Sequence, residues 1–178
     1  MALSVLYIGG TGQISLPCVE ASVALGHKVT LLNRGKTDVP LPAGVETVTG
    51  DMGGDTYAAL GDRKFDAVCQ FKLYRPDEMA RDIATFAGRT GQYVFISSAS
   101  AYEKPAQHYV ITEKTPLVNP YWEYSRNKIA CEELLAAQET LPWTVVRPSH
   151  TVRTSMPFAI GTVDVLLGRL LRGAPNIV

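Results

Sequence analysis

The chain has 178 residues, and its content of 46% hydrophobic and 19% charged residues is typical of a globular protein and argues against disorder, collagen or a coiled coil. Seventeen basic residues balance seventeen acidic ones, so the net charge does not favour nucleic acid or a membrane as a partner. Three widely spaced cysteines and the absence of a signal-peptide pattern or a long apolar stretch predict a single cytoplasmic domain without disulfides, a zinc site or a membrane span.

The beginning of the chain is an apolar stretch that breaks into glycines. Residues 3–8 suit a strand buried on both faces, and a helix is expected from Pro17 to Leu25. A helix N-terminus offers unpaired N–H groups, and glycines allow a phosphate to approach closely. Tight-turn geometry alone also explains such glycines, but their place between a strand and a helix favours a dinucleotide diphosphate. The predicted cofactor contacts here are Gly9, Thr11, Gly12, Gln13 and Ile14.

The second predicted strand, His27–Asn33, ends in Asn33-Arg34-Gly35-Lys36. In dinucleotide-binding folds an acid at this point binds the ribose 2′-hydroxyl of NAD, whereas an arginine accepts the 2′-phosphate of NADP. No acid is present, and two cations stand where charge-assisted bonds to a phosphate would form. We therefore predict NADP as the cofactor, with NAD as the alternative, and contacts from Asn33, Arg34 and Lys36. Alternatively, the two cations are ordinary solvated loop residues.

The middle of the chain continues the alternation of strands and helices. Strands are expected at Val45–Gly50, Phe65–Phe71 and Gln92–Ser98, with a short helix at 55–60 and a longer one at Pro76–Ala87. Asp51 follows the first of these strands and either accepts from an adenine amino group or is an ordinary turn aspartate.

The last third of the chain carries a helix expected from Asn119 and Pro120, as N-cap and first residue, to Gln138. A strand at Trp143–Arg147 and a helix at 163–171 follow. The whole pattern predicts an α/β fold, a doubly wound parallel sheet of the Rossmann type with right-handed crossovers.

Three polar side chains at one edge of this sheet suit hydride transfer. Tyr124 and Lys128 are four residues apart and therefore share one helix face. We expect the ammonium to favour the phenolate and so lower the tyrosine pKa, while its other protons hold the nicotinamide ribose. Ser98 follows a buried strand and is expected to orient a substrate hydroxyl or carbonyl toward Tyr124.

The sequence resembles the extended short-chain dehydrogenase/reductases over essentially its whole length, in particular the NAD-dependent epimerase/dehydratase branch and its chloroplast stem-loop-binding-protein group. The residues that carry the resemblance are Gly9 to Ser15, Asn33 to Lys36, Gly50-Asp51, Phe95 to Tyr102, Tyr124 to Lys128 and Arg147-Pro148-Ser149. The resemblance implies Tyr124 as acid/base, Lys128 as its pKa-lowering partner, Ser98 as the orienting hydroxyl and Pro148 near the carboxamide. Further cofactor contacts are expected at Asp51, Met52, Phe71 and Lys128.

Three features depart from the family pattern. Ser15 stands in place of the third glycine, and a small residue there still allows close packing of helix on strand. Phe71-Lys72-Leu73 replaces small residues next to the cofactor, so that Lys72 either intrudes into the site or reaches a phosphate. Family members continue for another hundred or more residues, so we expect a truncated chain in which 150–178 begin a substrate-binding lobe that is largely missing.

The resemblance implies an NAD(P)-dependent epimerase/dehydratase or reductase that transfers a hydride on a sugar nucleotide or similar hydroxy or carbonyl compound. The family's use of the Tyr124 helix as a dimer surface makes a homodimer a further expectation. The alternative is a dinucleotide sensor or RNA-associated protein that uses no hydride chemistry. The zero net charge and the presence of Ser98, Tyr124 and Lys128 argue against that alternative.

Overall fold

A computed structural model describes residues 1–36, 38–50, 57–151, 168 and 171–174. The chain divides into two compact units, Met1–Arg147 and Pro148–Val178. The predicted contacts Asp51 and Met52 lie outside the described residues. Of the helix predicted at 163–171, only Gly168 and Leu171 are described, and both are helical.

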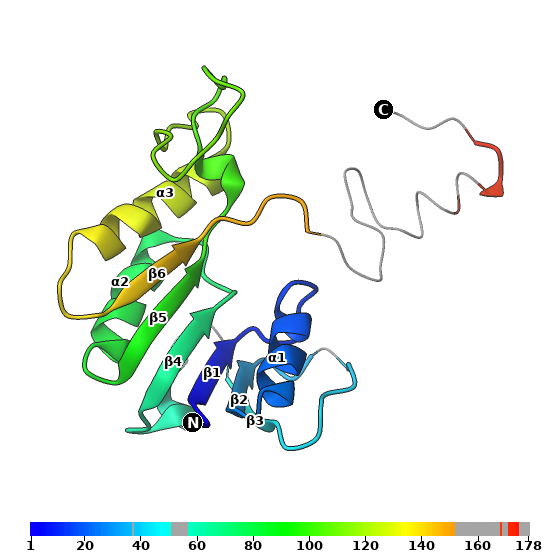
Figure 1. Cartoon of the computed structure of the whole chain (residues 1–178), viewed down its shortest axis with the longest axis vertical. Helices are drawn as coiled ribbons and strands as arrows, with labels where there is room; N and C mark the ends of the chain where they lie inside the picture. Colours follow the sequence, from blue (N-terminus) through cyan, green and yellow to red (C-terminus); the bar gives the residue numbers. More distant parts are fainter. Residues whose placement is uncertain (37, 51–56, 152–167, 169–170, 175–178) are drawn as a thin grey trace. The chain divides into compact units, whose positions relative to one another are not determined.

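The first unit alternates strands and helices (Figure 1). In chain order the elements are β1 (Ser4–Ile8), α1 (Ser15–Ala24), β2 (Lys28–Asn33), β3 (Glu46–Thr49), the short 3₁₀ helix η1 (Ala58–Leu60), β4 (Phe65–Gln70), α2 (Pro76–Phe86), β5 (Thr90–Ile96), the 3₁₀ helix η2 (Ala99–Ala101), α3 (Glu123–Ala136) and β6 (Trp143–Val146). Among the helices of the described part, none has the length and apolarity that a bilayer crossing requires.

The strands form one parallel sheet in the order β3-β2-β1-β4-β5-β6. This is the order of the Rossmann fold, in which the direction of winding reverses between β1 and β4. Ligands of such sheets bind outside the carboxyl ends of the strands at this reversal. The prediction of a doubly wound α/β sheet is therefore confirmed, and a ligand site is expected at the ends of β1, β2 and β4.

Strand β1 is apolar on both faces because helices cover both sides of the sheet (Figure 1). Successive side chains of a strand point to opposite faces. Val5 and Tyr7 accordingly pack with Val19 of α1, whereas Leu6 and Ile8 belong to the cluster that includes residues of α2 and α3. The continuous apolar stretch of the sequence thus reflects a central strand.

The expected start of α3 was wrong, because Asn119 is not the N-cap of that helix. The helix begins at Glu123, and Trp122 is its N-cap. The Asn119 side chain instead donates to the Ser100 carbonyl at 2.8 Å and accepts from the Tyr121 amide at 3.2 Å. Its amide group therefore ties the turn before α3 to η2, next to the strand end that carries Ser98.

Candidate active site

The glycine turn after β1 is held together by Ser15, the first residue of α1. The Ser15 hydroxyl donates to the Gly9 carbonyl at 2.7 Å and accepts from the Gly12 amide at 2.9 Å, and the side chain is buried. The helix therefore starts two residues before the predicted Pro17. Ser15 therefore does not disturb the turn, although it stands at the position of the third glycine. Its hydroxyl links Gly9 to Gly12.

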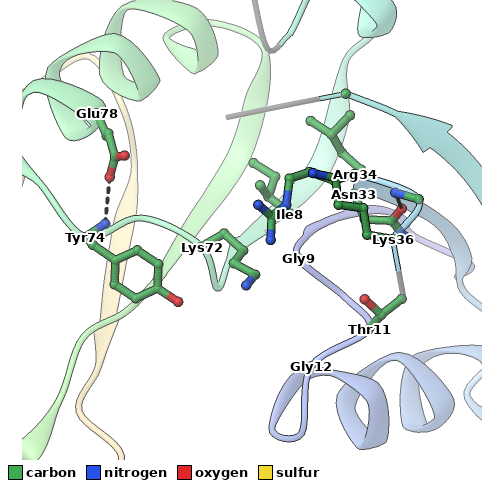
Figure 2. A pocket seen from close by; sticks show the side chains of 13 residues that line it. Ile8, Gly9, Thr11, Gly12, Asn33, Arg34, Lys36, Lys72, Tyr74 and Glu78 are labelled. Carbon is green, nitrogen blue, oxygen red and sulfur yellow. Dashed lines mark hydrogen bonds between the residues drawn. The ribbon is translucent and has the colours of Figure 1, made fainter. Parts of the chain in front are cut away.

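A pocket of about 250 Å³ opens at the carboxyl ends of β1 and β2 (Figure 2). It is lined by Ile8, Gly9, Thr11, Gly12, Leu32, Asn33, Arg34, Gly35, Lys36, Gly50, Lys72, Tyr74 and Glu78. The structure thus brings together six of the predicted cofactor contacts, from the glycine turn and from the end of β2. Gln13 and Ile14 immediately precede α1, with Ile14 as its N-cap, and are not among the residues that line the pocket.

Three cations line this pocket: Arg34, Lys36 and Lys72. None of them forms an ion pair with another residue in the described part of the chain. Asn33 shapes the loop that carries two of them, because its side chain accepts from the Gly35 amide at 2.9 Å. Uncompensated cations beside the N-terminus of α1 fit a ligand with several phosphates, as a dinucleotide has.

The opposite wall of the pocket is formed by Tyr74 and Glu78, which were not predicted as site residues. The Glu78 carboxylate accepts from the Tyr74 amide at 2.8 Å and the Arg75 amide at 3.0 Å. The acid therefore caps the start of α2, and its charge is already bound by backbone donors. A glutamate at the third position of a helix that begins with proline was the sequence signal available for this cap. No feature of the sequence indicated that Tyr74 would line the pocket.

A set of serine hydroxyls lies at the end of β5. Ser98 and Ser100 share a hydrogen bond of 2.8 Å between their hydroxyls, and the Ser100 amide also donates to the Ser98 hydroxyl at 3.1 Å. Buried Ser125 of α3 donates to the Ser100 hydroxyl at 2.9 Å. Ser98 is consequently fixed in position by the turn η2 and by the helix that carries Tyr124.

Lys128 is almost fully buried, at 1% exposure. Its ammonium donates to the carbonyls of Leu73 at 2.6 Å and Ile96 at 2.8 Å, and it lies 5.6 Å from the centre of the Tyr124 ring. The expectation that the two residues share a helix face is confirmed. Two of the three ammonium protons are engaged by backbone oxygens, so one remains for another acceptor. Burial lowers the lysine pKa to about 8.

The pKa of Tyr124 is raised, not lowered as the sequence suggested. Burial is the main cause, the nearby Tyr74 phenol adds to it, and a hydrogen bond with Ser98 acts in the opposite direction. The expectation failed because the Lys128 ammonium is directed at two carbonyls. A raised pKa keeps the phenol protonated near neutral pH, which is the state of a proton donor.

Tyr74 connects the pocket with these polar residues. It lines the pocket, its ring centre is 6.2 Å from that of Tyr124, and the Lys128 ammonium lies 4.9 Å from its ring centre. The cation-lined pocket and the cluster of Ser98, Tyr124 and Lys128 are therefore adjacent parts of one site.

Two further predicted contacts are located away from the pocket lining. The ring of Phe71 stacks on Tyr7 with 6.0 Å between centres and packs against the apolar cluster on the α1 side of the sheet. Pro148 begins the second unit, and its contact with a carboxamide stays a prediction. No group of histidine, cysteine and acidic residues suited to a metal occurs within the described ranges.

Comparison with known proteins identifies the family of the chain. Residues 9–162 match the family model described as NAD(P)H-binding. The chain is 33% identical over 137 residues to 2′-dehydrokanamycin reductase of Streptomyces kanamyceticus, covering 76% of this chain and 38% of that protein.

Solved structures share the fold at lower sequence identity. One is the enzyme WbmG of Bordetella bronchiseptica in complex with NAD and UDP, with 22% identity, a TM-score of 0.70 and coverage of 99% of this chain and 62% of that one. Another is the UDP-N-acetylglucosamine 4-epimerase of Methanobrevibacter ruminantium in complex with UDP-N-acetylmuramic acid, with 16% identity, a TM-score of 0.76 and coverage of 99% and 65%. The chain thus spans less than two thirds of each of these relatives. The glycine turn, the parallel sheet and the matched family model together show that the chain belongs to the NAD(P)H-binding family.

Proposed function

We propose that the protein is an NADP-dependent reductase or epimerase/dehydratase that acts on a hydroxyl or carbonyl group of a sugar-like substrate. The observation that carries the proposal is the position of Tyr124, whose ring centre lies 6.2 Å from that of the pocket-lining Tyr74 and 5.6 Å from the Lys128 ammonium. A proton donor and a hydrogen-bonding hydroxyl beside a dinucleotide pocket are the groups that carbonyl reduction requires.

The pocket residues would hold NADPH, which when bound would supply a hydride for a carbonyl carbon of the substrate. Tyr124 donates its phenolic proton to the carbonyl oxygen, and in the oxidative direction it takes the proton back. Ser98 shares a hydrogen bond with Ser100, which itself accepts from Ser125, and would direct the same oxygen toward the phenol. The remaining proton of the Lys128 ammonium, which the Leu73 and Ile96 carbonyls leave available, would hold a ribose hydroxyl of the bound cofactor.

The sugar-like substrate is inferred from the relatives. One of them is named as a reductase of 2′-dehydrokanamycin, and others are described as an epimerase of UDP-N-acetylglucosamine and as an enzyme in complex with UDP. The names of the reductase and of the epimerase both refer to a change at a sugar ring. We therefore propose a keto or hydroxy sugar, free or nucleotide-linked, for this chain.

Replacement of Tyr124 tests the chemistry. We expect Tyr124→Phe to lower NADPH oxidation with keto-sugar probes on the order of 10²- to 10⁴-fold, while the Kd of NADPH changes less than about twofold because no phosphate contact is lost. Tyr121→Phe is the matched control, since Tyr121 lies three residues earlier and is 75% exposed. Equal turnover of the Tyr124 variant and wild type would refute the proposed role.

Replacement of Arg34 tests the choice of cofactor. A charge-assisted hydrogen bond to the 2′-phosphate is worth roughly 1.5–3 kcal/mol, so Arg34→Ala should weaken NADPH binding on the order of tenfold or more. The Kd of NADH, which lacks this phosphate, should stay within about twofold of wild type. Calorimetric titration of both nucleotides measures the two effects. Equal losses of affinity for NADPH and NADH would show that Arg34 does not distinguish the two cofactors.

A further inference from the structure

The loop after β4 brings Lys72 to the glycine turn. The buried Gln70 side chain, at the end of β4, accepts from the Lys72 amide at 2.8 Å. Gln70 in turn donates to Asp82 of α2 at 2.6 Å, and the carboxyl of Asp82 also accepts from Tyr93 at 2.6 Å. A buried polar network thus fixes the backbone from which the lysine side chain extends.

The stem of this lysine covers Gly9. A Cβ placed on Gly9 would lie 2.3 Å from Cγ of Lys72, so the stem occupies the space that any side chain at Gly9 would need. Figure 2 shows Lys72 between Tyr74 and Gly9, with its ammonium directed into the gap that faces the glycine turn. The charge is therefore presented across the pocket from the N-terminus of α1.

We propose that Lys72 is a phosphate-binding residue whose ammonium binds the diphosphate bridge of the dinucleotide. The inference rests on the dinucleotide binding in the proposed function. The diphosphate of a bound dinucleotide lies at the glycine turn and the helix that follows it. Lys72 and α1 face this position from opposite sides, so the diphosphate is clamped between a helix N-terminus and a side-chain cation.

The same geometry separates Lys72 from the other two cations. Arg34 and Lys36 follow β2, where the 2′-phosphate of NADP binds, whereas Lys72 packs against Gly9 after β1. Glu78 lines the same pocket, but its carboxylate is bound by two backbone amides. The positive charge of Lys72 is consequently available to a phosphate that NAD and NADP share.

The test compares Lys72→Met with wild type in calorimetric titrations of NADH and NADPH. Methionine keeps the stem over Gly9 and removes only the charge. We expect Kd to rise for both nucleotides by the same factor, on the order of tenfold, and the dependence of Kd on salt concentration to become weaker. Lys64→Met, at an exposed lysine just before β4, is the matched control and should leave both affinities unchanged.

Three outcomes would overturn the inference. Unchanged affinities of Lys72→Met would show that the ammonium does not bind the ligand, and tighter binding would show that the lysine obstructs the pocket. A loss confined to NADPH would place the ammonium at the 2′-phosphate. Failure of the proposed function is distinguished by Tyr124→Phe: full turnover in that variant, together with Lys72-dependent binding of both nucleotides, would refute the chemistry and leave the inference standing.

Discussion

The cations in the two parts of the site differ in their burial and in their bonds to the rest of the protein. In the cation-lined pocket, Arg34 and Lys36 are exposed and have no ion-pair partner among the described residues. In the cluster around Tyr124, Lys128 is buried and bonded to two carbonyls. The pocket cations therefore remain available to a ligand, whereas the buried ammonium of the cluster is bonded mostly within the protein.

This difference matches the role that we propose for each part. Binding of phosphates needs charges that are not already neutralised. Proton transfer needs a donor held in a defined position, which a network of satisfied hydrogen bonds provides. We therefore expect substitutions in the cluster to affect the free energy of unfolding strongly and substitutions of the pocket cations to affect mainly ligand affinity.

The largest effect is expected at Glu132, which supports the cluster from α3. Its buried carboxylate accepts from the Arg147 guanidinium at 2.6 and 3.0 Å and from the Ser97 hydroxyl. Because removal of one partner leaves a charge without compensation, Glu132→Ala should lower the free energy of unfolding by about 3–5 kcal/mol. Glu133→Ala, at the exposed neighbouring position, should change it by less than about 0.5 kcal/mol. Similar urea midpoints for the two variants would show that the Glu132 carboxylate does not stabilise the fold at this point.

The second prediction concerns the buried charge of Lys128. The folded protein holds this proton less tightly, with a pKa of about 8 against an ordinary value of 10.5. Between these two pH values the unfolded chain binds more protons, so stability rises with pH. The gain should approach roughly 3 kcal/mol and should be absent from Lys128→Met. Urea unfolding of both proteins from neutral to alkaline pH measures it, and parallel profiles would show that the ammonium is solvated.

The third and smallest effect tests the contact between Lys72 and Gly9. Gly9 and Gly26 have nearly the same positive φ, +82° and +81°, but a Cβ on Gly26 would meet nothing within 4 Å. Alanine at either position should cost about 1–2 kcal/mol in backbone strain. Gly9→Ala must also displace the lysine stem, which should add about 1 kcal/mol and weaken NADPH binding. Equal unfolding free energies for the two variants would show that the stem does not press on Gly9.

Elements determined by local pattern could be predicted from the sequence. Apolar strands buried on both faces, helices with an apolar face and glycines at the end of β1 all depend on residues close together in the chain. They predicted the sheet, the glycine turn and the shared face of Tyr124 and Lys128. The ends of helices were predicted less well, since the starts of α1 and α3 depend on where the side chains of Ser15 and Asn119 find partners.

Contacts across the sheet could not be predicted in this way. Tyr74 lies beside Tyr124 because the loop after β4 meets α3, and no residue near Tyr74 in the sequence indicates this. The direction of the Lys128 ammonium was missed for the same reason, since one of its two acceptors lies in the loop after β4 and the other at the end of β5. The raised pKa of Tyr124 follows from this packing.

The sequence by itself thus determined the family and the fold, because motifs, periodicity and turn chemistry are local properties of the chain. The tertiary structure alone decided the surroundings of the candidate site residues. It placed Lys72 over Gly9 and bound Lys128 to backbone oxygens, while leaving the pocket cations without ion-pair partners among the described residues. The physical reason is that burial, desolvation and hydrogen-bond partners are set by residues that come together only when β1, β4 and β5 pair in one sheet.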